Sequence, residues 1–173
     1  MKHKQKVGLK RNSLFKNQVG VKQDSIENFC KKLKKAKEAK ISDYLFIIAR
    51  IESFILGKDL KDAMRRAEAY SQAGADAILI HSKEKYPNQI FSFSKNFSKS
   101  KFFKPLIAVP STYSRTYEHE LINNGFKVVI YANHFLRAIH PAILNVAKMI
   151  LKNQRSFEAE KKISSINEVI NLI

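Results

Sequence analysis

Short apolar runs alternate with longer amphipathic segments along most of the chain. The apolar runs predict β-strands over 44–49, 77–80, 106–109 and 127–131. The segments between and after them carry apolar residues at helical spacing and predict helices over 60–73, 88–97, 117–124 and 135–152. Strands that alternate with helices are typical of βαβ units in a parallel sheet.

The two ends of the chain depart from this alternation. Residues 1–23 are basic and contain Gly8, Asn12, Ser13, Asn17 and Gly20, which is typical of a loop. Asp24 or Ser25 can then cap a helix with Ile26 and Leu33 on its apolar face. The chain closes with an amphipathic segment over 163–173.

Four βα units make half of an eight-stranded barrel, whereas a complete barrel typically needs about 250 residues. We therefore predict an α/β fold, half of a (β/α)8 TIM-type barrel with additional helices at the carboxyl end. Such a half-barrel has two unpaired strand edges.

The composition fits one globular domain. The chain has 173 residues, of which 45% are hydrophobic, and no apolar run is long enough to span a bilayer. Its single cysteine, Cys30, excludes an internal disulfide, which fits a reducing compartment. We expect a cytoplasmic protein without a membrane partner.

The charge balance is strongly basic, with 32 Lys+Arg against 15 Asp+Glu and a net charge of +17. This balance suits a nucleic acid or a small anionic substrate. The lysines are scattered through helices and loops without a recognisable RNA- or DNA-binding motif, so we favour solvated helix faces over a nucleic-acid groove.

Polar side chains follow the predicted strands where the strands end. Arg50 follows the first strand and His81 the second, and carboxyl ends of parallel strands are where ligands bind in α/β folds. Arg50 can hold a phosphate or carboxylate in a bidentate manner, or form a structural salt bridge to Glu52. His81 can donate to an anion or serve a structural role. Residues at the same position on later strands are Ser111, Thr112, Asn133 and His134.

Metal-binding patterns are missing from the sequence. The acidic residues fall mainly in helical segments, and no Asp-x-Asp, His-x-x-x-His or glycine-rich phosphate loop occurs. The residues by themselves thus predict a half-barrel that binds a small anion, with no protein cage for Mg²⁺ or Zn²⁺.

The segment from Lys6 to Ser13 resembles the signature of the phosphoenolpyruvate mutase family in the isocitrate lyase superfamily. That signature reads Glu-Asp-Lys, five residues, then Asn-Ser, and Lys6, Asn12 and Ser13 match it. The resemblance continues through DSIENFC, IARIES, RRAEAY, AGADAILIHSK, VPSTY and VIYANHFLRA, and so covers essentially the whole chain.

The resemblance implies an enzyme of phosphonate biosynthesis, an isomerase that moves a phosphoryl group within its substrate. Members interconvert phosphoenolpyruvate and 3-phosphonopyruvate with Mg²⁺, beneath a gating loop that excludes water. By matching motif, Lys10 and Asn12 would be catalytic loop residues, and Ser13, Arg50 and His81 would bind the substrate.

The departures from the family pattern concern the metal. Lys4-Gln5 replaces the Glu-Asp of the signature, and the family's first half, with the aspartates that organise Mg²⁺, has no counterpart. We therefore expect a C-terminal half of a mutase, a fragment without metal ligands that is inactive alone. We read 1–173 as one partial barrel domain, with the gating-loop segment over 1–23, βα units over 24–153 and a tail over 154–173.

Two alternatives to a mutase remain. The chain could belong with phosphonopyruvate hydrolase, although the Asn12-Ser13 pair favours the mutase. It could also be a non-catalytic half-barrel module for binding or assembly. Because family members are commonly homotetramers that exchange a terminal helix, we expect a homo-oligomer, with 135–152 at its interface, or pairing with a complementary N-terminal half.

Overall fold

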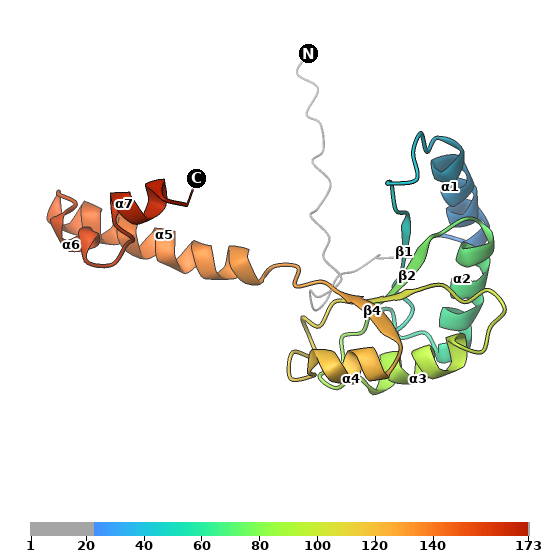
Figure 1. The fold of residues 1–173 in the computed structure, drawn as a ribbon. Helices are drawn as coiled ribbons and strands as arrows, with labels where there is room; N and C mark the ends of the chain where they lie inside the picture. Colours follow the sequence, from blue (N-terminus) through green and yellow to red (C-terminus); the bar gives the residue numbers. More distant parts are fainter. Residues whose placement is uncertain (1–22, 173) are drawn as a thin grey trace, which may run out of the picture. The chain divides into compact units, whose positions relative to one another are not determined.

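The computed structural model describes residues 23–172 and contains two compact units, which divide between Tyr131 and Ala132. The first unit holds a parallel sheet and its helices (Figure 1). Its elements, in chain order, are α1 (Ile26–Glu38), β1 (Ile48–Ile51), α2 (Leu60–Gln72), β2 (Ala77–Ile80), α3 (Asn88–Phe97), β3 (Leu106–Ala108), α4 (Glu118–Asn123) and β4 (Phe126–Val129).

The sheet has four strands in the order β1-β2-β3-β4, and all neighbouring pairs are parallel. Each strand is followed by a helix, so each connection returns the chain to the same end of the sheet. The predicted β2 and α3 are confirmed at the predicted residues, and the other helices and later strands differ from prediction by one or two residues at their ends. The half-barrel prediction is therefore confirmed in its element order.

The prediction for the first strand was wrong: β1 begins at Ile48 rather than Tyr44. Strand pairing starts at Ile48 opposite Ala77, and the Asp76 carboxylate accepts the Ile47 N–H at 2.9 Å just before it. The apolar residues Tyr44 to Phe46 have no strand beside them in the described structure and are exposed. Their apolar side chains resemble those of a buried strand, but β1 begins only at Ile48, where β2 lies beside it and can pair with it.

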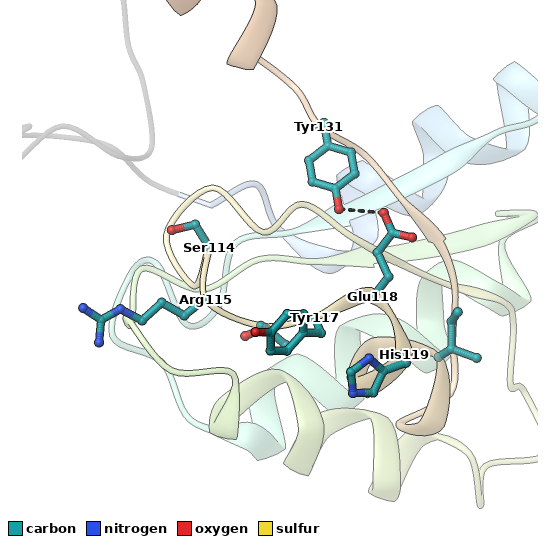
Figure 2. A pocket seen from close by; sticks show the side chains of 8 residues that line it. Ser114, Arg115, Tyr117, Glu118, His119 and Tyr131 are labelled. Atoms are coloured by element: carbon teal, nitrogen blue, oxygen red, sulfur yellow. Dashed lines mark hydrogen bonds between the residues drawn. The ribbon is translucent and has the colours of Figure 1, made fainter.

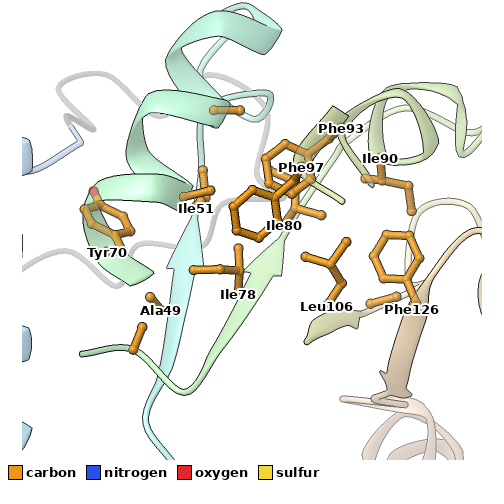
Figure 3. Packing of buried hydrophobic residues seen from close by; sticks show 14 of the residues in the cluster. Ala49, Ile51, Tyr70, Ile78, Ile80, Ile90, Phe93, Phe97, Leu106 and Phe126 are labelled. Atoms are coloured by element: carbon orange, nitrogen blue, oxygen red, sulfur yellow. The ribbon is translucent and has the colours of Figure 1, made fainter. Parts of the chain in front are cut away.

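The core lies between the sheet and the helices that cover one of its faces. Ala49 and Ile51 of β1 and Ile78 and Ile80 of β2 pack with residues of α2 and α3 (Figure 3). The opposite face carries a smaller apolar cluster of Ala77, Leu79, Ile107 and Val109. Side chains alternate between the two faces along each strand, so the sequence position of a residue fixes the face on which it lies.

Local capping explains where the helices begin and end. Ser25 Oγ accepts the N–H of Asn28 at 3.1 Å and caps α1, and Asp59 Oδ1 accepts the N–H of Asp62 at 2.8 Å and caps α2. Gly74 has a φ of 109° just after α2, a conformation that side chains with a Cβ disfavour. The Ser25 contact confirms the predicted capping of α1, and the φ of Gly74 is that of a left-handed cap after α2.

The second unit is helical, with α5 (His134–Asn153), α6 (Phe157–Glu160) and α7 (Ile166–Ile170). No residue of α5 is buried, although the helix carries many large apolar side chains. Among the described helices, none combines the length and hydropathy that crossing a bilayer requires.

Candidate anion-binding site

The carboxyl edge of the sheet brings the two predicted anchors, Arg50 and His81, onto one face. Arg50 pairs with Leu79 across β1 and β2, and His81 follows two residues after Leu79, with its N–H donated to the Ile51 carbonyl at 3.3 Å. Because side chains alternate in direction, Arg50, Leu79 and His81 share the face opposite the helices. The sequence predicted that both residues lie at the carboxyl edge of the sheet. The register of β1 and β2 shows that their side chains also lie on the same face.

Arg50 lies within β1, near its end, rather than after it as predicted. Its guanidinium Nε donates to the Glu52 carboxylate, which is the structural ion pair that the sequence left as an alternative. The pair does not bury the arginine, because 45% of its side chain remains exposed against 25% for Glu52. An exposed pair of this kind contributes little to folding, so Arg50 can exchange Glu52 for a bound anion at a small cost.

His81 is held very differently, because only 2% of it is exposed. Its Nδ1 is buried and has no hydrogen-bond partner among the described residues. Burial, and then the charge of Arg50, lower the pKa of His81 to about 4. The imidazole is therefore neutral near pH 7, and a bound anion beside it would raise its pKa again.

Two loops beyond the strand ends are fastened to each other. Thr112 Oγ1 donates to the Ser82 carbonyl at 2.7 Å, Ser82 Oγ donates to Gln89 Oε1 at 2.6 Å, and the Glu84 N–H donates to Ser82 Oγ at 3.1 Å. Thr112, predicted as a rim residue, thus holds the loop after β3 against the loop after β2. This connection positions Ser82, which directly follows His81.

A polar network at the start of α2 was not predicted from the sequence, although Arg66 lies in the RRAEAY motif. Asp62 Oδ2 accepts from Ser53 Oγ at 2.8 Å and from Arg66 Nε at 3.1 Å. Arg66 Nη1 donates to the Tyr70 hydroxyl at 2.8 Å and to the Asp24 carbonyl at 2.9 Å. Burial raises the pKa of Asp62, but the bonds from Ser53 and Arg66 outweigh it, so the pKa lies below its usual range.

This network joins three parts of the chain. Ser53 follows β1 two residues after Ile51, Arg66 lies on the inner face of α2, and Asp24 precedes α1. The network therefore fixes the point where the chain leaves the predicted loop segment relative to the end of the strand that bears Arg50.

The described residues do not fit a magnesium ion. No group of three or more His, Cys, Asp or Glu side chains within 23–172 could hold a metal. Glu52, the carboxylate at this edge, already pairs with Arg50, and Asp62 is saturated by Ser53 and two arginines. Mg²⁺ prefers several oxygen ligands in octahedral geometry, which these two engaged carboxylates do not offer.

The structure describes only some of the remaining predicted residues. Lys10, Asn12 and Ser13 fall outside the described residues, so the structure does not test their roles. Asn133 and His134 belong to the second unit, at the beginning of α5.

A parallel sheet with helices on one face and polar residues at its carboxyl edge defines a barrel-type α/β protein. A sequence profile of the family described as phosphoenolpyruvate phosphomutase matches residues 12–151. The chain therefore belongs to the phosphoenolpyruvate phosphomutase family. It is 36% identical over 147 residues to a phosphoenolpyruvate phosphomutase of Tetrahymena pyriformis, covering 85% of this chain and 48% of that protein.

Solved structures agree with this assignment. A phosphoenolpyruvate phosphomutase from Streptomyces platensis subsp. rosaceus superimposes with a TM-score of 0.82 at 37% identity, over 94% of this chain and 55% of that one. A phosphonopyruvate hydrolase in complex with oxalate and Mg²⁺ gives a TM-score of 0.76 at 35% identity, over 86% of this chain and 52% of that one. The chain thus spans about half the length of its relatives, and its sheet is half of their barrel.

Proposed function

We propose that this chain serves the interconversion of phosphoenolpyruvate and 3-phosphonopyruvate in phosphonate biosynthesis, as the substrate-holding half of a phosphomutase. The observation that carries the proposal is the family match over residues 12–151, which includes both Arg50 and His81. The proposal assigns these two side chains to the phosphoryl or carboxylate oxygens of the substrate.

The chemistry of phosphoryl transfer suits such a site. Its transition state is largely dissociative, so catalysis depends on positioning and on stabilising negative charge. Arg50 offers a planar set of donors that is half exposed at the sheet edge. His81 is buried and neutral, so it offers a ring N–H without adding charge, and burial holds the ring in place.

The loop residues complete the proposed site. Lys10 and Asn12 would contact the transferring group, and Ser13 would bind the substrate as the segment closes over it. Exclusion of water separates transfer from hydrolysis, because water readily captures a metaphosphate-like species. We assign no magnesium ligand to residues 23–172, and we propose that the chain alone does not turn over.

Phosphonopyruvate hydrolysis is the second candidate function. The solved hydrolase is nearly as similar to this chain as the solved mutase, with 35% against 37% identity. The Asn12-Ser13 pair of the mutase signature favours the first candidate.

A phosphorus NMR time course with phosphonopyruvate, Mg²⁺ and the purified chain tests the proposal. We expect the phosphonopyruvate signal to broaden on binding without forming product, and we expect phosphoenolpyruvate to form once the N-terminal half of the Streptomyces platensis relative is added. Inorganic phosphate as the product would establish the hydrolase instead. Conversion by the chain alone would contradict its predicted inactivity.

Matched arginine variants test whether the broadening of the phosphonopyruvate signal depends on Arg50. Arg50→Gln should reduce the broadening, whereas Arg65→Gln, which removes an equal charge from an exposed position on α2, should leave it unchanged. Equal broadening in both variants would overturn the assignment of Arg50 as a substrate ligand.

A further inference from the structure

A polar hollow lies at the carboxyl edge of the sheet, between the loops that follow β2 and β3. It has a volume of about 370 Å³ and is lined by Lys85, Tyr86, Thr112, Ser114 and Arg115. Neither Arg50 nor His81 lines it. The candidate substrate site does not account for this hollow.

The hollow contains two cations without acidic partners. Among the described residues, neither Lys85 nor Arg115 forms an ion pair. Most of the other described arginines are paired with carboxylates. Glu118, which lines a neighbouring hollow, accepts a hydrogen bond from the Tyr131 hydroxyl at 2.7 Å (Figure 2). Two positive charges that form no ion pair with a described residue and lie around one concavity attract an anion.

The walls of the hollow are preorganised. The 2.7 Å bond from Thr112 Oγ1 to the Ser82 carbonyl holds the two loops together, which fixes the separation of the segments that carry Lys85 and Arg115. This bond uses the only hydroxyl proton of Thr112, so Thr112 positions the loops and does not donate to a ligand. The donors that remain are Lys85 Nζ, the Arg115 guanidinium and the hydroxyls of Ser114 and Tyr86.

These donors match a tetrahedral oxyanion. Arginine binds phosphate oxygens in a bidentate manner, lysine adds a point charge, and hydroxyls can donate to the remaining oxygens. A carboxylate has only two oxygens and would leave part of this donor set unused. We propose that the hollow between Lys85 and Arg115 is a second anion-binding site, which takes a phosphate or phosphonate dianion independently of Arg50 and His81.

The dianion could be free phosphate or the phosphoryl group of an organic molecule. A larger hollow of about 960 Å³ adjoins the one lined by Lys85 and shares Ser114 and Arg115 with it. It is lined by Tyr117 and His119, whose rings stack at 5.3 Å, and by Ile122 (Figure 2). Because these rings offer an apolar surface beside the phosphate donors, the site favours an organic phosphate with an aromatic group.

Calorimetric titration of the full chain with inorganic phosphate and with phenyl phosphate tests both the anion site and its preference for an aromatic phosphate. All titrations use the Arg50→Gln background, which removes the first anion site. We expect phosphate to bind, Lys85→Gln and Arg115→Gln each to weaken binding at least about fivefold, and Lys95→Gln, an exposed lysine on α3, to leave it unchanged. Phenyl phosphate should bind more tightly than phosphate, and Tyr117→Ala should remove that advantage alone.

The outcomes separate the possibilities. No phosphate binding in the Arg50→Gln background, or equal losses in the Lys85, Arg115 and Lys95 variants, would overturn the second site. Equal affinity for phosphate and phenyl phosphate would overturn the organic ligand. Because Arg50 is absent throughout, failure here leaves the phosphomutase proposal standing, and failure of that proposal leaves this site standing.

Discussion

At the scale of single residues, His81 carries the clearest physical signature. Burial and the neighbouring Arg50 both oppose its protonation, so its pKa falls to about 4 from the ordinary value of 6.5. The unfolded chain binds a proton at this residue below about pH 6.5, whereas the folded chain does so only near pH 4. The unfolded state therefore binds more protons in this window, and the protein loses stability as the pH falls through it.

We predict that the free energy of unfolding decreases from pH 6.5 to pH 4, with a contribution from His81 of up to about 1.4 kcal/mol per pH unit. His81→Gln should flatten this dependence in urea unfolding curves. His119→Gln, which removes an exposed histidine, should keep it. An unchanged pH dependence in His81→Gln would show that the residue does not hold a depressed pKa.

At the scale of elements, α2 holds the site together through its inner face. Asp62 pairs with two arginines, Arg65 and Arg66, of which the side chains are 69% and 10% exposed. The two arginines share one partner and one helix, but only Arg66 is buried and also donates to Tyr70 and Asp24.

We predict that Arg66→Ala destabilises the protein by about 2–4 kcal/mol, because it leaves Asp62 and the Tyr70 hydroxyl without their buried partner. Arg65→Ala should cost less than about 0.5 kcal/mol, because its ion pair is exposed to water. Chemical unfolding of the two variants measures both values. Equal losses would contradict a role for the buried network.

At the scale of the whole molecule, two apolar regions carry large exposed side chains. One is the stretch Tyr44 to Phe46 before β1, and the other is α5, where Phe135, Leu136, Ile143 and Leu151 are between 64% and 78% exposed. A helix gains most of its stability from packing an apolar face, so the exposed apolar face of α5 is suited to a packing partner. We propose that a second copy of the chain supplies it.

Sedimentation equilibrium of the purified chain tests self-association through α5. We predict a concentration-dependent mass above that of the monomer, and Ile143→Lys should shift the equilibrium toward the monomer. Lys148→Gln changes an exposed polar position on the same helix and should have little effect. Monomeric behaviour of the unsubstituted chain at all concentrations would contradict this interface.

The order of strands and helices, the capping by Ser25 and Gly74 and the edge that bears Arg50 and His81 were all determined by the sequence itself. Each depends on local periodicity or on a single residue type, and such signals act over a few neighbouring residues. The family membership was also carried by motifs that are contiguous in the sequence.

Contacts between distant residues were decided only by the tertiary structure. Pairing with Ala77 moved the start of β1 to Ile48, and packing made His81 buried and neutral. The bond between Thr112 and Ser82, 30 residues apart, joins the loops that form the hollow lined by Lys85 and Arg115. Sequence patterns record which side chains alternate along one element, but register and burial depend on which other elements lie beside it.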